Sequence, residues 1–465
     1  MTTSEVLPSS FRDPAGFLFK QGDTLYRQIN NSYAKDYDTL ISSGLYAALI
    51  KAQLLIPHEE VEIELPDPEL SYKTIQPQLV PFISYPYEWS FSQLKDAALA
   101  TMTVQRLALK HGMSLKDASA YNIQFHNGRA VLIDSLSFMR YEEGKPWQGY
   151  KQYCQHFLSP LALMCYSDVR LSQLLRVYID GIPLDLASKL LPARTKLSPF
   201  LLSHIHAHAK AQQRFGETAE DGSPLQVKPI SRKAMEAMMQ TLHAGTRKLQ
   251  WQLPKTEWGD YYSATNYEDE SLQEKENLVR EYLTEIGEHA LPVHDLGANN
   301  GHFSRVACEL GYKAVAWDID PVAVEKNYLQ LKKERQFNLL PLLLDLTNPS
   351  GAIGWSLTER DSFCERINDG VVMALALIHH LAISNNVPLT MISAFLKAIA
   401  QHVVIEFIPK SDSQFRRLLA NRTDIFTEYS QEGFESAFTV DFEIVKREQI
   451  RGSERSLYLL HRKNN

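Results

Sequence analysis

The chain has few cysteines, and none of them is spaced for a metal site. Only 4 of the 465 residues are cysteine, with no CxxC pair and no His-paired metal spacing. Each one lies among apolar neighbours, so we interpret all four as reduced residues of the core: Cys154, Cys165, Cys308 and Cys364. This pattern excludes a small fold stabilised by disulfides or zinc.

Long apolar runs and an excess of basic charge are also missing. The longest apolar runs, 339–344 and 371–378, are far shorter than the ~18 residues that a membrane-spanning helix needs. Residues 1–16 lack the basic and apolar regions of a signal peptide, so we expect a cytoplasmic chain without a membrane span. The formal net charge of −7 does not indicate the basic surface that a protein needs to bind a phosphate backbone. We therefore do not expect nucleic acid as a partner.

What is present indicates more than one domain. The 465 residues are about three times the ~150-residue prior for a single domain. Residues 11–210 are rich in aromatic side chains and leucine, whereas residues 213–228 are polar and contain glycine and proline, so we end the first domain at residue 212. Ser231 can cap a helix that we expect to pack between domains. We therefore place a linker and connecting helix at 213–257 and a second domain at 258–465.

The second domain alternates short apolar runs with helical patterns. From Leu291 onward the pattern predicts a strand, a turn, a helix and another strand. Further runs predict buried strands at 339–344, 371–375, 403–407, 442–445 and 457–460. Because helical patterns separate most of these runs, the sequence predicts an α/β domain with a largely parallel sheet.

A turn containing glycine follows the first of these strands. Asp295, Gly297 and Gly301 form a DxGxxxG pattern where the strand ends and the helix begins, which is where doubly wound sheets bind nucleotides. Asp318 ends the next apolar run, where a carboxylate can accept hydrogen bonds from two ribose hydroxyls. Together these features indicate an adenosine-type ligand, and a turn without any cofactor is the alternative.

These elements resemble motifs I and II of the class I methyltransferases, which use S-adenosyl-L-methionine, and WDIDP matches the second motif closely. The resemblance implies a Rossmann-like seven-stranded sheet in which Asp318 holds the ribose and the glycine turn lies against the methionine part of the cofactor. Asp345, after the third strand, would meet the adenine amino group. The predicted cofactor-binding residues are Asp295, Gly297, Ala298, Asn299, Gly301, Phe303, Asp318, Ile319 and Asp345.

Candidates for the chemistry of methyl transfer follow the fourth and fifth strands. Methyl transfer is an in-line displacement, so the protein must align the acceptor and, for a hydroxyl, accept its proton. His379 and His380 are candidate bases, with shaping of the pocket or capping of the next helix as the alternative. Glu406 is a third catalytic candidate, although a glutamate at a strand end is more often structural. The aromatic segment 258–267 is either a lid over the cofactor or packing against the sheet.

Two absences after the fourth strand narrow the acceptor. The chain has no (D/N)PPY motif there, which argues against methylation of exocyclic base amines, and no Pro-Cys pair, which argues against carbon-5 of pyrimidines. We therefore expect a small-molecule or glycan acceptor.

The first domain contains the spacing of a kinase catalytic loop. Asp117 and Asn122 form DxxxxN, and Asp134 follows a short strand. In such a site Asp117 would accept the proton of an acceptor hydroxyl, while Asn122 and Asp134 would hold the magnesium of Mg-ATP. The usual neighbours of both aspartates and an upstream GxGxxG are missing, so the site is degenerate or unusual, and a loop capped by Asp and Asn is the alternative. This half is similar to the α+β kinase-like and aminoglycoside-phosphotransferase-like folds.

Two further patterns belong to the first domain. A hairpin at 16–29 could cover a phosphate, with Arg27 or Lys35 as the cation. The three alternating histidines of 204–208 would gather a metal only on a strand, and the surrounding helical pattern favours a solvated or packing role.

Phrases along nearly the whole chain resemble a bacterial family of class I methyltransferases with nodulation-protein (NoeA-like) members, among them YRQIN, ISYPYEWSFSQLKDAAL, SLKDASAYNIQF and DLGANNGHFS. The resemblance implies methyl transfer and leaves the acceptor open, although a nodulation link favours a glycan. Pairing a kinase-like half with a methyltransferase also resembles bifunctional enzymes that phosphorylate and then methylate glycan ends.

Three functions stay open on this basis. The first is O-methylation of a glycan or small metabolite, with the kinase-like half recognising or phosphorylating the acceptor. The second is a phosphotransferase coupled to a methyltransferase, and the third is a non-catalytic scaffold that binds S-adenosylmethionine. The sequence leaves the oligomeric state open.

Overall fold

The computed structural model describes most of the chain, namely residues 4–211, 229–254, 269–367, 369–419 and 423–464. The polar stretch 213–228 and the aromatic segment 258–267 lie outside the described residues, so the linker and the lid stay predictions. The chain divides into two compact units, which are residues 1–252 with 352–360 and residues 253–351 with 361–465.

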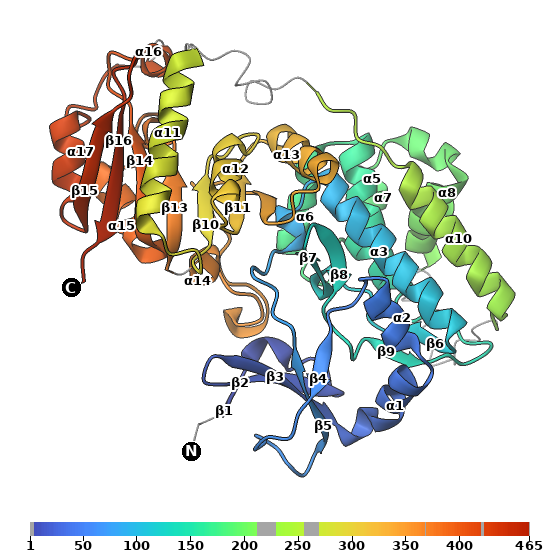
Figure 1. Ribbon diagram of the computed structural model, residues 1–465. Helices are drawn as coiled ribbons and strands as arrows, with labels where there is room; N and C mark the ends of the chain where they lie inside the picture. Colours follow the sequence, from blue (N-terminus) through green and yellow to red (C-terminus); the bar gives the residue numbers. More distant parts are fainter. Residues whose placement is uncertain (1–3, 212–228, 255–268, 368, 420–422, 465) are drawn as a thin grey trace. The chain divides into compact units, whose positions relative to one another are not determined.

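Unit 1 begins with a five-stranded antiparallel sheet in the order β1-β2-β3-β5-β4 (Figure 1). Its strands are β1 (Ser4–Val6), β2 (Gly16–Gln21), β3 (Thr24–Asn30), β4 (His58–Glu60) and β5 (Ser71–Pro77). The predicted hairpin at 16–29 is confirmed, because β2 pairs with β3 across a turn in which Gly22 has a φ of 58°. Helices α1 (Ala34–Ser42) and α2 (Leu45–Lys51) follow β3.

The rest of unit 1 is mainly helical and is organised around α3 (Phe91–Lys110). Ser90 caps this helix in a capping box with Gln93, which satisfies two backbone donors at the helix start. Two short antiparallel pairs follow, β6 (Met113–Leu115) with β9 (Phe138–Arg140) and β7 (Ile123–His126) with β8 (Arg129–Leu132). Further helices are α4 (Tyr150–Tyr153), α5 (Ser159–Tyr166), α6 (Leu174–Val177), α7 (Leu184–Leu190), α8 (Pro199–Leu201) and α10 (Arg232–Lys248).

Helix α10 is the helix predicted from Ser231. The Ser231 hydroxyl accepts a hydrogen bond from the backbone N–H of Ala234, as expected of a helix cap. Met235, Met239 and Leu242 are buried, and the helix packs against α3 and α8. Its apolar stripe is thus covered within unit 1, and the expectation that the helix packs between domains stays a prediction.

Unit 2 is built on a seven-stranded sheet in the order β12-β11-β10-β13-β14-β16-β15. Its strands are β10 (Val293–Leu296), β11 (Ala314–Asp318), β12 (Leu339–Leu343), β13 (Gly370–Ala374), β14 (Ala400–Phe407), β15 (Phe442–Gln449) and β16 (Ser456–Arg462). All neighbouring strands are parallel except where β16 pairs with β14 and β15. The predicted α/β class and the largely parallel sheet are confirmed.

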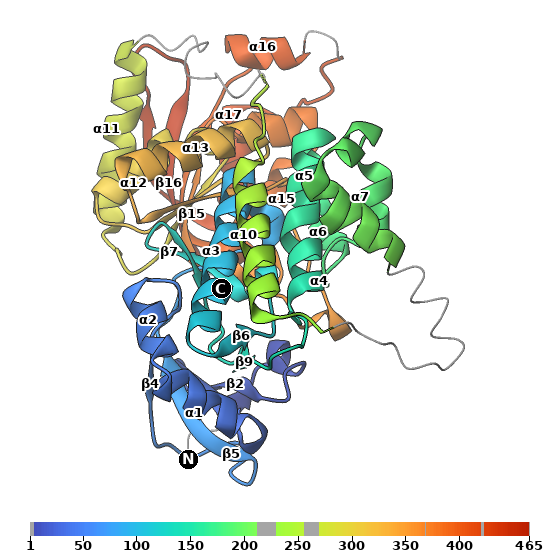
Figure 2. The same ribbon diagram turned by 90° about the vertical axis from the view of Figure 1, so that its right-hand side faces the viewer.

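Helices cover both faces of this sheet (Figures 1 and 2). One face carries α11 (Asp269–Ile286), α12 (His302–Glu309) and α13 (Pro321–Glu334), and the other carries α14 (Phe363–Ile367), α15 (Leu389–Ile399) and α17 (Gln431–Phe438). A short helix, α16 (Ser413–Leu419), follows β14. Because both faces are covered, strands β10, β11 and β13 are buried throughout.

The strand order positions a site. From β10 the chain proceeds to β11 and β12 on one side, and it resumes on the other side of β10 with β13 and β14. The carboxyl ends of β10 and β13 therefore form the switch point at which doubly wound sheets bind ligands.

Residues 352–360 belong to unit 1, although they lie between β12 and α14 of unit 2 in the sequence. The Glu359 side chain is only 2% exposed and lies 2.8 Å from the Arg12 guanidinium. The Arg360 guanidinium lies over the Tyr121 ring, 4.5 Å from its centroid. No motif in the sequence marks this segment.

Two composition-based expectations concern the whole chain. All four cysteines are free thiols, with Cys154 and Cys308 buried and the other two partly exposed. In the part of the chain that the structure describes, no helix combines the length and the apolar character needed to cross a bilayer.

Candidate functional site

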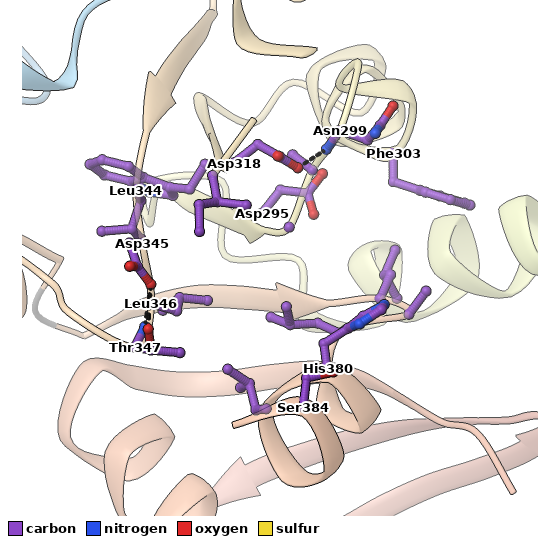
Figure 3. Close-up of a pocket in the computed structure, with 18 of the residues that line it drawn as sticks. Asp295, Asn299, Phe303, Asp318, Leu344, Asp345, Leu346, Thr347, His380 and Ser384 are labelled. Atoms are coloured by element: carbon purple, nitrogen blue, oxygen red, sulfur yellow. Dashed lines mark hydrogen bonds between the residues drawn. The ribbon is translucent and has the colours of Figure 1, made fainter. Parts of the chain in front are cut away.

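A cavity of about 340 Å³ lies at the carboxyl ends of β10, β11, β12 and β13 (Figure 3). This volume is within the range of about 300–1,000 Å³ that small-molecule pockets have. Eight of the nine predicted cofactor residues line it: Asp295, Gly297, Ala298, Asn299, Phe303, Asp318, Ile319 and Asp345. The prediction therefore identified residues that the fold gathers at one point.

The glycine turn after β10 faces the cavity through its backbone. The N–H groups of Gly297 and Ala298 both donate to the carbonyl oxygen of Trp317 at 2.9 Å, which ties the turn to the end of β11. Gly297 has a φ of 77°, a conformation that glycine adopts without steric cost, and Asn299 follows with a φ of 52°. A side chain at Gly297 would also approach Leu377, which lines the same cavity.

Gly301 is the predicted residue that is not among the described residues lining the cavity. It precedes α12 with a φ of 78°, and a Cβ there would lie 2.4 Å from Nδ2 of Asn327 on α13. Glycine suits this position because of its positive φ and because the Asn327 side chain occupies the space of a Cβ, and its predicted role in cofactor binding stays a prediction.

Asp318 connects the turn to the end of β11. Its Oδ2 accepts the N–H of Asn299 at 2.7 Å and its Oδ1 accepts the N–H of Asp320 at 2.8 Å (Figure 3). Burial raises the pKa of Asp318 to about 6, so the carboxylate is ionised at neutral pH. Each carboxylate oxygen has a second lone pair, so Asp318 can also accept hydrogen bonds from two ribose hydroxyls.

Two further carboxyl groups line the cavity. Asp295 is buried and accepts the hydroxyl of Ser304 at 2.6 Å, and burial raises its pKa to about 6. Asp345 accepts the N–H and the hydroxyl of Thr347 at 2.9 and 2.6 Å. Figure 3 shows Asp345 on one side of Asp318 and Phe303 on the other, so the cavity has two distinct ends.

The two histidines after β13 have different positions. His380 lines the cavity, whereas His379 is 2% exposed and is not among the lining residues. Burial lowers the pKa of His380 to about 4 and that of His379 well below its usual value, so both imidazoles are neutral at physiological pH. Of the two candidate bases, only His380 is in a position to contact a ligand of this cavity.

His380 begins a π-helical turn, His380–Ser384, of a kind often found at functional sites. Ser384 and Asn385 line the cavity beside it. Neither residue was predicted from the sequence, because a π-turn follows neither the helical nor the strand period on which such predictions depend.

Glu406 at the end of β14 is fully buried and is not among the described lining residues. Its Oε2 lies 2.6 Å from Nζ of Lys275 and accepts the N–H of Ala376 at 2.8 Å, and its Oε1 lies 3.4 Å from Nη1 of Arg455. This candidate catalytic carboxylate therefore has a structural position. Lys275 on α11, which the sequence analysis did not identify, lines the cavity instead.

In unit 1 the three residues with kinase-like spacing lie close together. The Asn122 side-chain amide donates to Ser137 Oγ at 3.3 Å, and that hydroxyl donates to Asp134 at 2.8 Å. Asn122 also hydrogen-bonds to Asp117, whose pKa is raised by burial. Arg27, one of the two predicted cations, lies 2.7 Å from Asp134.

These contacts do not fit a Mg-nucleotide site. Both oxygens of Asp134 are engaged by protein donors, because Arg27 and the N–H of Leu136 contact one oxygen and Ser137 contacts the other. Over the described ranges, no three His, Cys, Asp or Glu side chains form a group that could hold a metal ion. Arg27 pairs with Oδ1 of Asp134 at 2.7 Å, so a magnesium ion at that oxygen would have to displace the guanidinium.

The alternating histidines of 204–208 have separate partners. His204 Nδ1 lies 2.8 Å from the hydroxyl of Tyr150, and the ring of His208 stacks on the same tyrosine. His206 Nδ1 lies 2.8 Å from Ser188 Oγ. The predicted packing role is confirmed.

The sequence of this chain is similar to that of a known protein. No family model matches the chain. Nodulation protein NoeA of Rhizobium meliloti (strain 1021) is 35% identical over 463 residues, which cover 97% of this chain and 95% of NoeA.

Solved structures resemble the chain only slightly. The bifunctional kinase-methyltransferase WbdD is 16% identical, with 42% of this chain and 40% of WbdD covered and a TM-score of 0.29. Magnesium protoporphyrin IX methyltransferase (ChlM) from Synechocystis PCC 6803, with bound SAH, is 15% identical, with 42% of this chain and 84% of ChlM covered and a TM-score of 0.31.

Unit 2 has the seven-stranded Rossmann-like sheet that the sequence predicted. The identity to NoeA extends over nearly the full length of both proteins. The chain therefore belongs to the family of nodulation protein NoeA.

Proposed function

We propose that the chain is an S-adenosylmethionine-dependent methyltransferase, with the cofactor bound in the cavity of unit 2. One observation supports this above all: residues from three separate strand ends, predicted as a cofactor site, line a single cavity at the switch point of the sheet. When bound, the cofactor supplies a methyl group on a sulfonium centre.

The residues present fit this cofactor. Asp318 would accept hydrogen bonds from the ribose hydroxyls, since it is ionised at neutral pH and held in place by Asn299 and Asp320. Asp345 would lie at the adenine end, and Phe303 lies toward the opposite end of the cavity (Figure 3).

We propose a hydroxyl of a glycan or small metabolite as the methyl acceptor. His380 stays unprotonated through the neutral range, so its ring can accept a proton from a hydroxyl as the new bond forms. Ser384 and Asn385 supply hydrogen-bonding groups on the same side, while Leu377 and Leu381 supply apolar surface. The choice of a glycan rests on the nodulation link that the sequence resemblance implies, and the relative is a nodulation protein.

For unit 1 we propose recognition of the acceptor rather than its phosphorylation. The engagement of Asp134 by Arg27 and Ser137 favours this choice. A phosphotransferase is the second candidate, and it rests on the juxtaposition of Asp117, Asn122 and Asp134.

Calorimetry on the full chain tests the cofactor, and a methyl-transfer assay against hydroxyl-bearing sugars and metabolites tests the reaction. We expect binding of S-adenosylmethionine and S-adenosylhomocysteine, followed by turnover with at least one acceptor. Failure to bind either compound would overturn the proposal, and binding without turnover across a broad acceptor panel would favour a cofactor-binding scaffold. Mg-ATP is titrated in parallel, and phosphoryl transfer that is lost in Asp134→Ala would establish the phosphotransferase.

A further inference from the structure

Among the described residues that line the cavity of unit 2, Lys275 is the only lysine or arginine. We infer that Lys275 binds the α-carboxylate of the cofactor's methionine part. This inference rests on the proposed function and assigns a role to a residue that lies outside the glycine turn and the strand ends.

The position of Lys275 matches the methionine end of the cavity. Its side chain is 3% exposed, and its Nζ lies 4.6 Å from the centroid of the Phe303 ring. In Figure 3, Phe303 lies on the opposite side of Asp318 from Asp345, the residue at the proposed adenine end. With the ribose on Asp318, the amino-acid part of the cofactor would extend toward Phe303 and Lys275.

Glu406 is the counter-ion of the Lys275 ammonium group and holds it in place. The two groups are 2.6 Å apart and both are buried, and a buried ammonium without a counter-ion would be strongly destabilised. Arg455, the other cation near Glu406, has a partner of its own, since its Nε lies 2.8 Å from Asp412. An ammonium group has three N–H donors, so Lys275 can bind Glu406 and a ligand carboxylate at the same time.

A negatively charged group also lines the cavity and could pair with the α-ammonium of the cofactor. The methionine part carries an α-ammonium as well as an α-carboxylate, and Asp295 lines the same cavity on the side of α12, where Ser304 holds it. Lys275 and Asp295 therefore supply one group for each charge of the zwitterion. A ligand without the amino-acid part would gain nothing from either residue.

Three ligands separate this role from a merely structural one. S-Adenosylhomocysteine contains the whole amino-acid part, its decarboxylated analogue lacks only the carboxylate, and 5′-methylthioadenosine lacks both charged groups. We expect Lys275→Met to weaken S-adenosylhomocysteine about 10- to 100-fold, the scale of hydrogen bonds to charged groups, and to change the other two by less than about threefold. Calorimetry with all three ligands measures this difference.

Two variants control for the loss of a buried charge. Lys275→Met leaves Glu406 without its closest cation, so the double variant Lys275→Met, Glu406→Gln removes both charges and should show the same selectivity for ligands. Lys397→Met breaks an ion pair of the same unit, with Asp441 at 3.2 Å, away from the cavity, and should leave all three affinities unchanged.

Two outcomes would overturn the inference. One is an equal loss for all three ligands in both Lys275 variants, which would mean that the lysine only shapes the cavity. The other is an unchanged affinity for S-adenosylhomocysteine. Either result leaves the proposed function intact, whereas a wild-type chain that binds none of the three ligands would overturn the proposed function itself.

Discussion

The carboxylates of the two predicted sites differ in what remains available to a ligand. In unit 2, Asp318 accepts two backbone N–H groups, and its carboxylate still lines a cavity. In unit 1, Asp134 has the expected spacing from Asn122, but its oxygens are held by Arg27, Leu136 and Ser137. Spacing in a sequence can therefore bring carboxylates together without leaving them open, and only the open arrangement is ready to bind a ligand.

The largest effect should separate the two neighbouring histidines. If His380 accepts the proton of the acceptor, His380→Ala should lower the methyl-transfer rate by about 10²–10⁴, the usual contribution of a general base. His379→Ala is the matched control, because His379 is equally aromatic but is not among the described lining residues. A loss of less than about threefold in both variants would leave the two histidines structural.

The second effect concerns the cofactor. Asp318→Ala should cost about 1.5–3 kcal/mol of affinity for S-adenosylhomocysteine, because it removes charge-assisted hydrogen bonds to the ribose. Asp424→Ala removes an exposed carboxylate paired with Lys410 and should leave the affinity unchanged. Calorimetry measures both variants, and equal affinities for Asp318→Ala and wild type would refute the assignment of the ribose site.

The same contrast explains what the sequence could predict. The turn at Gly297 and the strand end at Asp318 are close in sequence, and the β-α-β pattern between them sets their geometry, so the motif was sufficient. The strands of unit 2 were predictable for a related reason, since buried parallel strands are continuous apolar runs.

The residues that were missed depend on tertiary packing. Lys275 reaches the cavity because α11 lies against the sheet, and nothing in the charged pattern of that helix shows that its one lysine is buried while its other charged residues are not part of the cavity. Glu406 pairs with Lys275 and Arg455 instead of lining the cavity, and both partners are distant from it in sequence. The pairing of Arg27 with Asp134 joins β3 to the segment after β8, and no local motif records it.

A smaller effect tests whether the Asp134 carboxylate of unit 1 is engaged by protein groups rather than available to a ligand. Asp134→Ala should lower the free energy of unfolding by about 1–3 kcal/mol, because Arg27 and Ser137 lose a buried acceptor. Chemical denaturation measures this loss, and a cycle with Arg27→Met should show coupling of about 0.5–3 kcal/mol between the two residues. Mg-ATP should not raise the melting temperature of the wild type. A rise that is absent in Asp134→Ala would mean that Arg27 yields to a metal, and the contrast between the two sites would no longer hold.

The smallest effect uses pH to test whether the carboxylates of unit 2 are open. Burial raises the pKa of Asp318 and of Asp295 to about 6, so both groups take up protons as the pH falls through 6. A ligand that requires the ionised form of one group should lose about tenfold in affinity for each pH unit below 6, and little above it. Calorimetric titration of S-adenosylhomocysteine between pH 5 and pH 7, in the wild type and in Asp318→Asn, measures this slope. The variant should bind more weakly at pH 7 and show a shallower slope, because only Asp295 then titrates. An affinity that is constant over this range would mean that neither carboxylate has to be ionised for binding, and that Asp318 acts only in holding the turn at Asn299.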